Sequence, residues 1–226
     1  MSKKDEFPPS CAFCGTLNCY RRNKSFPSFC LTEASKKQAA QALKLYKKGG
    51  ADAAIARAAA EIEGEYYGRL TRVEETVLFA KKIGAKKIGI ATCIGLIEET
   101  RIFAKVLEAA GLIPKAVLCK VGSTDKTEIG IPEDLKVEPG QHESLCNPAL
   151  QAKLLDDWGS ELNVMVGLCV GHDSIFIKHS KAPTTCLIVK DRVLAHNPAG
   201  ALHTSGFYYK RLFDESKWPK PNSELK

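Results

Sequence analysis

The sequence predicts an α/β fold, in which a Rossmann-like parallel sheet flanked by helices follows an N-terminal cysteine-rich metal knot and a helical collar. Short apolar runs typical of buried strands alternate with amphipathic helical stretches from residue 85 onward. Such alternation indicates parallel strands joined by right-handed crossovers. Four of the nine cysteines lie in the first 33 residues, a segment that needs a staple to stay folded. We therefore expect a cysteine-rich metal-binding segment (1–33), a helical collar (34–84) and a Rossmann-like α/β domain (85–226).

The composition narrows the class of protein. No stretch approaches the roughly 20 apolar residues of a membrane span, and Met1 to Pro9 is charged and then proline-rich, unlike a signal peptide. We therefore expect a cytoplasmic protein with no membrane partner. Cytoplasmic thiols are kept reduced, so nine cysteines favour metal binding or thiol chemistry over a disulfide framework. The formal charge of +7 comes largely from lysine pairs on helix faces, which disfavours nucleic acid as a partner.

Helical patterns fill the predicted collar. Apolar residues recur at helical spacing from Ala34 until Gly49-Gly50 ends the run. An alanine-rich helix fits residues 51–63, and a third helix fits 65–83, which ends at Gly84.

The α/β domain is expected to contain four strands. They are predicted at 88–91, 116–118, 163–166 and 185–189, with helices after Cys93 and at about 148–158 and 173–180. The polar stretch 120–144 is long for a compact domain, and such a loop is a lid, a binding loop or disordered.

The N-terminal cysteines have the spacing of metal ligands. Cys11 and Cys14 form a C-x-x-C pair, and Cys19 and Cys30 complete a set of four soft ligands. The set suits tetrahedral zinc or an iron-sulfur cluster, and the spacing does not choose between them. The alternative is four thiols that bind no metal. A thioredoxin-like pair is disfavoured because prolines precede Cys11 and Gly15 follows Cys14.

Four further cysteines are expected to meet at one edge of the sheet. Three follow predicted strands and the fourth precedes a helix, and loops after parallel strands converge on one point. Helix N-termini beside Cys93, Cys146 and Cys169 would lower the pKa of these three thiols, and the glycines two residues after Cys93 and Cys169 permit close backbone approach. The alternative is that each cysteine packs in the core. The four residues are Cys93, Cys119, Cys146 and Cys169.

Other residues near these positions have both a structural and a functional interpretation. Cys186 lies inside an uninterrupted β run and is interpreted as core. His172 and Asp173 stand at a strand-to-helix junction, where they could bind a ligand or act as acid and base near a metal. The alternative for Asp173 is that it or Ser174 caps the helix. The polar residues around Lys190 to Arg192 and around His196 are expected at the same edge of the sheet as the four cysteines.

The motifs together resemble a known family. They are Cys11-x-x-Cys14 with Cys19 and Cys30, Cys93-Ile-Gly-Leu, Cys119-Lys-Val-Gly, Cys146-Asn-Pro, and the run from Gly167-Leu-Cys-Val-Gly-His-Asp-Ser to Asp191-Arg-Val-Leu-Ala-His-Asn-Pro198. The chain resembles the uncharacterised cysteine-rich metal-binding protein family of anaerobic bacteria and archaea, a domain of unknown function. The resemblance implies metal binding and names no reaction.

Three functions follow, and the sequence does not decide whether the protein is an enzyme. The leading hypothesis is an iron-sulfur protein, with a four-iron four-sulfur cluster favoured at Cys119, Cys146 and Cys169. Cys93 would be the fourth ligand or an acid-base thiol, zinc could occupy the N-terminal site, and the chemistry would be redox or sulfur transfer. Its partner would be an unidentified small molecule or an electron-transfer protein.

The second hypothesis is an enzyme with structural zinc, in which Cys93 or Cys169 is a nucleophile activated by His172. The third is a non-catalytic, metal-stabilised interaction module. The sequence leaves the oligomeric state open.

Overall fold

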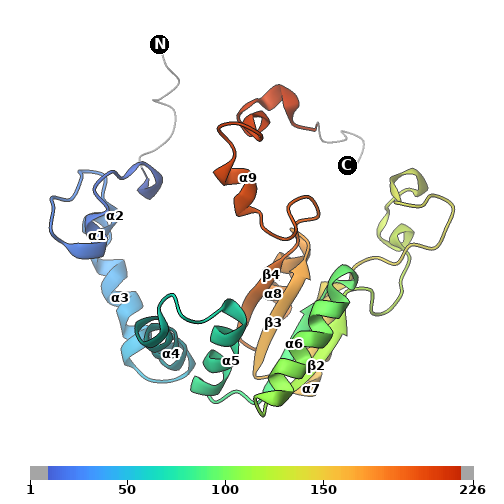
Figure 1. The fold of residues 1–226 in the computed structure, drawn as a ribbon, viewed down its shortest axis with the longest axis horizontal. Coiled ribbons are helices and arrows are strands. Elements are labelled where there is room, and N and C mark those ends of the chain that lie inside the picture. The colour runs from blue at the N-terminus through green and yellow to red at the C-terminus, as the bar shows by residue number, and fades with distance from the viewer. Residues whose placement is uncertain (1–9, 220–226) are drawn as a thin grey trace. The chain divides into compact units, whose positions relative to one another are not determined.

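The chain divides into two compact units, Met1–Glu65 and Tyr66–Lys226, and a computed structural model describes residues 10–219 of them (Figure 1). The charged and proline-rich start, on which the expectation of no signal peptide rested, lies outside the described residues. Among residues 10–219, no helix is long and apolar enough to cross a membrane. The division into 1–33, 34–84 and 85–226 stays a prediction.

The first unit is built of short turns followed by two longer helices. The cysteine-rich part holds a 3-10 turn at Cys11–Phe13 and the single-turn helices α1 (Asn18–Arg21) and α2 (Leu31–Ala34). The buried Asn18 closes a loop here, because its Oδ1 accepts a hydrogen bond from the backbone N–H of Lys24 at 2.7 Å. Helices α3 (Lys36–Lys47) and α4 (Ala51–Tyr66) follow, separated by glycines.

The second unit begins with α5 (Arg72–Lys82), which differs from the predicted helix 65–83. Helix α4 continues to Tyr66, and α5 begins only after Thr71. The reason is a capping box: Thr71 Oγ1 accepts the backbone N–H of Glu74, and the Glu74 carboxylate accepts the N–H of Thr71 at 2.7 Å. These bonds satisfy donors that the first helical turn leaves free, so the helix starts there.

Four parallel strands form the predicted sheet. They are β1 (Lys87–Thr92), β2 (Ile113–Leu118), β3 (Leu162–Leu168) and β4 (Thr184–Val189), in the order β2-β1-β3-β4. The prediction of an α/β fold with a parallel sheet flanked by helices is confirmed. From β1 the chain moves outward to β2 and later returns on the other side to β3. The carboxyl ends of β1 and β3 therefore flank a topological switch point, the usual ligand site of such sheets.

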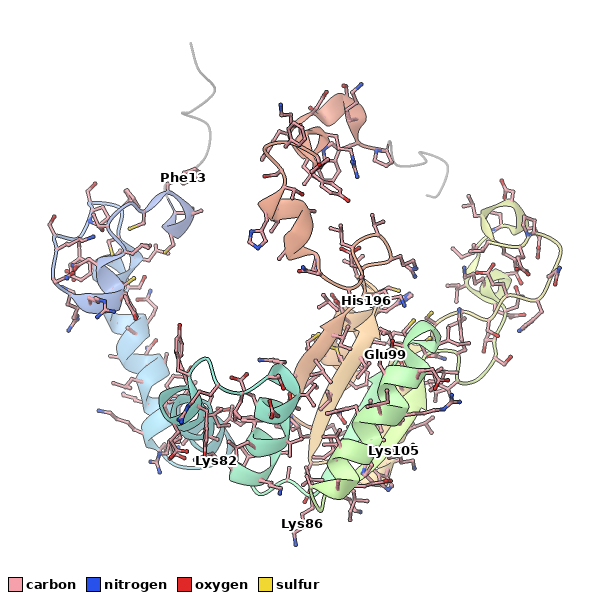
Figure 2. The ribbon with its side chains drawn as sticks, viewed as in Figure 1. Phe13, Lys82, Lys86, Glu99, Lys105 and His196 are labelled. Atoms are coloured by element: carbon pink, nitrogen blue, oxygen red, sulfur yellow. The ribbon has the colours of Figure 1, made fainter. Side chains whose placement is uncertain are left out.

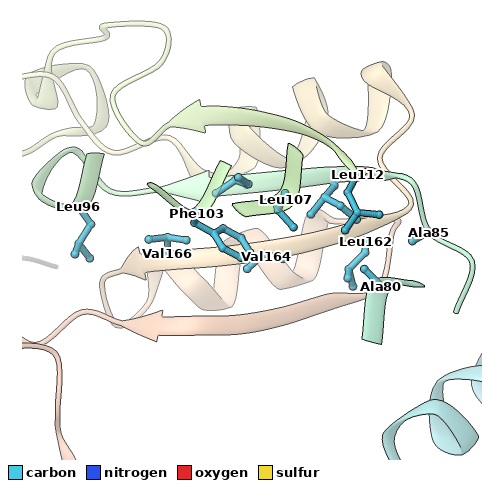
Figure 3. Close-up of a cluster of buried hydrophobic side chains, with 11 residues drawn as sticks. Ala80, Ala85, Leu96, Phe103, Leu107, Leu112, Leu162, Val164 and Val166 are labelled. Atoms are coloured by element: carbon cyan, nitrogen blue, oxygen red, sulfur yellow. The ribbon is translucent and has the colours of Figure 1, made fainter. Parts of the chain in front are cut away.

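Helices cover both faces of the sheet (Figure 1). Helix α6 (Ile97–Ala109) packs with α5 on one face, over a cluster that includes Phe103, Leu162 and Val164 (Figure 3). Helices α7 (Pro148–Trp158) and α8 (His172–His179) pack on the other face, where Leu155 and Phe176 join a cluster with Met165 of β3. In β3, Val164 and Val166 belong to the first cluster and Met165 between them belongs to the second, as expected of a sheet buried on both faces.

The polar stretch after β2 is an ordered loop, and we call residues 120–145 the cover loop. It contains two 3-10 turns, Lys126–Ile129 and Glu133–Leu135, and a bridge pairs Asp125 with Ser144 at its base. After β4 come α9 (Ala199–His203) and two further 3-10 turns, Lys210–Phe213 and Glu215–Lys217.

A thiol cavity at the carboxyl end of the sheet

Four cysteines from separate parts of the α/β unit line a single cavity of about 660 Å³. Three of them directly follow β1, β2 and β3, and the fourth stands just before the cap of α7. Backbone bonds extend the sheet to these positions, since Cys93 N donates to Val166 O at 3.0 Å and Cys119 N to Thr92 O at 2.8 Å. The structure thus brings together all four predicted residues: Cys93, Cys119, Cys146 and Cys169.

Three of the four sulfurs form a hydrogen-bonded row with Cys119 in the middle. Hydrogen bonds with Cys146 and Cys93, together with burial, raise the pKa of the Cys119 thiol well above its usual range. The bond with Cys119 lowers the pKa of Cys93 and of Cys146, each to about 5. The outer two thiols therefore ionise before Cys119, whose single S–H can donate to one of them at a time.

Three cations lie beside three of the thiols. Lys190 contacts Cys93 and lowers its pKa, in addition to the larger effects of Cys119 and the Gly95 N–H. Lys120 does the same for Cys146, after the larger effect of Cys119.

The third cation is Arg192, whose Nη2 donates to Cys169 Sγ at 3.1 Å. The remaining thiol, Cys119, accepts a hydrogen bond from the backbone N–H of Ile94 at 3.4 Å. Each sulfur of the cavity thus has a donor or a cation directed at it, and at Cys93 and Cys146 these neighbours favour the thiolate.

Gln151 of α7 fixes the strand ends that carry two of these cysteines. Its side chain is fully buried, and its Nε2 donates to Thr92 O at 3.1 Å and to Val117 O at 2.7 Å. Thr92 directly precedes Cys93, and Val117 lies two residues before Cys119. Sequence reasoning missed Gln151, although a glutamine among the apolar residues of α7 was a signal that could have found it.

His172 and Asp173 have different positions. His172 lines the cavity, and its charge contributes to the lowered pKa of Cys146, after Cys119 and Lys120. Asp173 is absent from the cavity wall, and its Oδ1 accepts the backbone N–H of Ser174 at 2.7 Å. Neither Asp173 nor Ser174 caps α8, because the N-cap residue is Gly171 and it has no side-chain cap bond. The predicted acid-base role of Asp173 stays a prediction.

The N-terminal cysteines lie in turns of the first unit. Cys11 and Cys19 are exposed, and Cys14 and Cys30 are half-buried. A hydrogen bond with the Thr16 hydroxyl, 3.6 Å from Cys14 Sγ, and the backbone N–H groups of Leu17 and Thr16 lower the pKa of Cys14. The metal knot itself stays a prediction.

The donor chemistry of the cavity fits a soft metal, while its side-chain positions do not form a finished ligand set. Thiolates with N–H and cationic donors directed at sulfur are the surroundings that iron-sulfur and zinc-thiolate centres use. Within residues 10–219, however, no group of three or more histidine, cysteine, aspartate or glutamate side chains is arranged to hold a metal ion. A metal would require the thiols to turn from one another toward a common point.

Cys186 lies in β4 and packs against the core cluster under α7 and α8, which matches its interpretation as a core residue. Burial raises the pKa of its thiol. It also borders a second cavity of about 440 Å³ with Glu99 and His196, which Figure 2 labels at one end of the sheet.

The fold and the cavity define an α/β protein with a thiol-lined site at the switch point of a parallel sheet. Residues 30–187 match the family described as "Protein of unknown function (DUF1847)", and the chain belongs to this family. It is also similar to "Uncharacterized protein MJ0455" of Methanocaldococcus jannaschii, with 48% identity over 160 residues, which are 71% of this chain and 80% of the relative. The expected membership of a family of unknown function is confirmed. The matched region contains the cavity cysteines and Cys30, whereas Cys11, Cys14 and Cys19 precede it.

Proposed function

We propose that this protein binds an iron-sulfur cluster, with a four-iron four-sulfur cluster favoured, in the thiol cavity. Cys119, Cys146 and Cys169 would hold it, with Cys93 as the fourth ligand or as a neighbouring acid-base thiol. The observation that carries the proposal is that four thiols from four chain segments line one cavity at the switch point of the sheet.

The charges around the cavity support this proposal. Thiolate ligation leaves a cluster with net negative charge, and nearby hydrogen bonds and charges set its reduction potential. Lys190, Lys120 and Arg192 each stand beside a sulfur, and the Ile94 N–H donates to a fourth. These residues would stabilise the ligands as thiolates and would partly offset the negative charge of the cluster.

When bound, the cluster would supply electron transfer or, with one open iron, a Lewis acid for a small substrate. The residues of this chain would ligate it, and the cover loop would limit its contact with water. The partner would be an electron-transfer protein or a small molecule. A second centre, zinc or iron-sulfur, would be held by Cys11, Cys14, Cys19 and Cys30 and would keep residues 1–33 folded.

Metal analysis of protein purified without oxygen tests the proposal. We expect iron and acid-labile sulfide well above one equivalent, with a visible thiolate-to-iron absorption band. The Cys169→Ser variant should lose the iron and sulfide bound in the thiol cavity and keep the fold of the unaltered protein. Cys186→Ser is the matched control, because Cys186 is also half-buried but lies outside this cavity. Equal metal content in Cys169→Ser and the unaltered protein would overturn the two-site proposal.

A second candidate is a thiol enzyme, favoured by the pKa of about 5 for Cys93 and Cys146. A thiol that is ionised at neutral pH can act as a nucleophile. Colourless protein that holds one zinc, together with rapid alkylation of Cys93 alone, would favour this candidate over the cluster.

A further inference from the structure

The cavity has an apolar wall that the thiols do not explain. This wall belongs to the cover loop and consists of Ile129, Ile131, Leu135, Val137 and Leu145. Ile129 is 65% exposed and Leu135 is 39% exposed, so other protein side chains leave much of their apolar surface uncovered. A ligand with an apolar body would remove that surface from water.

The cover loop presents this wall from a braced structure. The Lys136 side chain is only 3% exposed, and its Nζ contacts Asp125 Oδ1 at 2.9 Å and Glu133 Oε1 at 2.7 Å. The Asp125 carboxylate also accepts the backbone N–H groups of Thr127 at 2.9 Å and Glu143 at 2.8 Å. These bonds connect the two ends of the loop with its middle, so they hold the apolar wall in one conformation.

The volume is that of a small-molecule site. The cavity of about 660 Å³ lies within the range of roughly 300 to 1,000 Å³ typical of ligand pockets. Apolar walls with a few polar groups are also typical of such pockets. Thiols or a metal centre would occupy one side and leave room beside the cover loop.

Arg192 gives the cavity a cation that can bind an anion. Among the described residues that line it, the one carboxylate is that of Glu143, and Lys126 pairs with it. Lys120 and His172 also line the cavity, and both act on Cys146, one of the two thiols with a lowered pKa. Arg192 uses one N–H on Cys169 Sγ, and the planar guanidinium has further N–H groups that suit a carboxylate.

We propose that the cavity binds a small organic carboxylate with an apolar body. The carboxylate would lie at Arg192, because Lys126 already pairs with Glu143 and Lys120 already faces Cys146. The apolar body would pack under the cover loop. This inference goes beyond the proposed cluster, since the groups that it uses are present in metal-free protein.

Equilibrium dialysis of reduced, metal-free protein with 2-naphthoate and with 2-naphthylmethylammonium tests the proposal. The two probes share an apolar body and differ in charge. We expect the carboxylate to bind at least about tenfold more tightly, equivalent to about 1.4 kcal/mol. Arg192→Met should remove most of this preference. Equal affinity for the two probes, or no binding of either, would overturn the proposal.

A matched pair of variants locates the site. Ile129→Asp, at a position 65% exposed, should weaken 2-naphthoate binding by about tenfold or more. Ile102→Asp, at a position 64% exposed on α6 and away from this cavity, should leave it unchanged. Equal losses in both variants would contradict the assignment.

The same experiment separates this inference from the cluster proposal. Naphthoate binding by protein that cannot be loaded with iron would support the carboxylate site and contradict the cluster. A loaded cluster without naphthoate binding in either form would contradict the carboxylate site alone.

Discussion

The ammonium of Lys190 occupies the space that a side chain at position 95 would need. A Cβ on Gly95 would stand 2.7 Å from Lys190 Nζ, closer than real Cβ contacts come. Gly95 also donates its backbone N–H to Cys93. The Cys93-Ile94-Gly95 turn therefore serves the thiol in two ways: it supplies a donor and leaves room for a cation.

Gly95→Ala should raise the pKa of Cys93 by displacing the flexible end of Lys190. Lys190→Met should raise it further, by about 1 or more, because a nearby opposite charge favours the thiolate. The pH profile of Cys93 alkylation in reduced, metal-free protein measures this, starting from a midpoint near 5. Cys146 is the internal control, since its cation is Lys120. A midpoint unchanged in both variants would contradict the role of Lys190.

Cys119→Ala should raise the pKa of both outer thiols, because it removes the donor that contributes most to lowering them. Cys119→Ser keeps a hydroxyl donor at the same place, so it should raise the two values less. Separate alkylation profiles of Cys93 and Cys146, read by mass spectrometry, compare the two variants. The hydrogen-bonded row predicts that both outer thiols respond, and a response confined to one of them would contradict it.

Acid should loosen the cover loop. Hydrogen bonds from the Thr127 N–H and the Lys136 ammonium lower the pKa of Asp125, and Lys136 lowers that of Glu133. A carboxylate with a lowered pKa stabilises the fold above its unfolded value, about 4, and this contribution is lost as the pH falls through the lowered values. The protection of residues 120–145 from hydrogen exchange, relative to the intrinsic rate at each pH, should therefore fall below about pH 4. In Lys136→Met this protection should already be low at neutral pH.

Cys14→Ser should make the N-terminal segment sensitive to trypsin at Arg21, Arg22 and Lys24, because four-cysteine metal sites hold such segments folded. The α/β unit should keep its cooperative unfolding. A chelator should have the same effect on unaltered protein. Equal cleavage rates with and without a chelator would contradict a metal at Cys11, Cys14, Cys19 and Cys30.

The sheet and the meeting of four cysteines could be predicted because both depend on the direction of the chain. Parallel strands bring their carboxyl ends to one edge, so residues directly after β1, β2 and β3 must lie near one another. The start of α5 was missed although Thr71 and Glu74 have the capping-box spacing, since the apolar stripe continues across the turn.

The partners of the thiols could not be predicted in the same way. Lys120 looks like a surface residue in a sequence with 33 lysines and arginines. Its contacts depend on where the side chain points after the chain turns, and no periodic pattern carries that information. Lys190 and Arg192 were placed at the edge of the sheet that carries the cysteines, but their pairing with Cys93 and Cys169 came only from the structure.

The approach of β1 to β3 depends on a glycine. A Cβ on Gly89 would stand 2.1 Å from Oδ1 of the buried Asn163 and 3.0 Å from Leu155 Cδ1. Gly89→Ala should therefore destabilise the protein by about 1 to 3 kcal/mol, the usual cost of overpacking a core. Asn163→Ala removes the obstructing oxygen but also the bond from Nδ2 to Ser180 Oγ at 2.7 Å.

The double variant Gly89→Ala/Asn163→Ala should consequently lose less stability than the sum of the two single variants, because the added methyl group enters the vacated space. Chemical denaturation of all four proteins measures this coupling. Strictly additive losses would mean that movement of the strands, and not the vacated space, relieves the clash. In that case the metal content of the cavity site should fall already in the Gly89→Ala single variant.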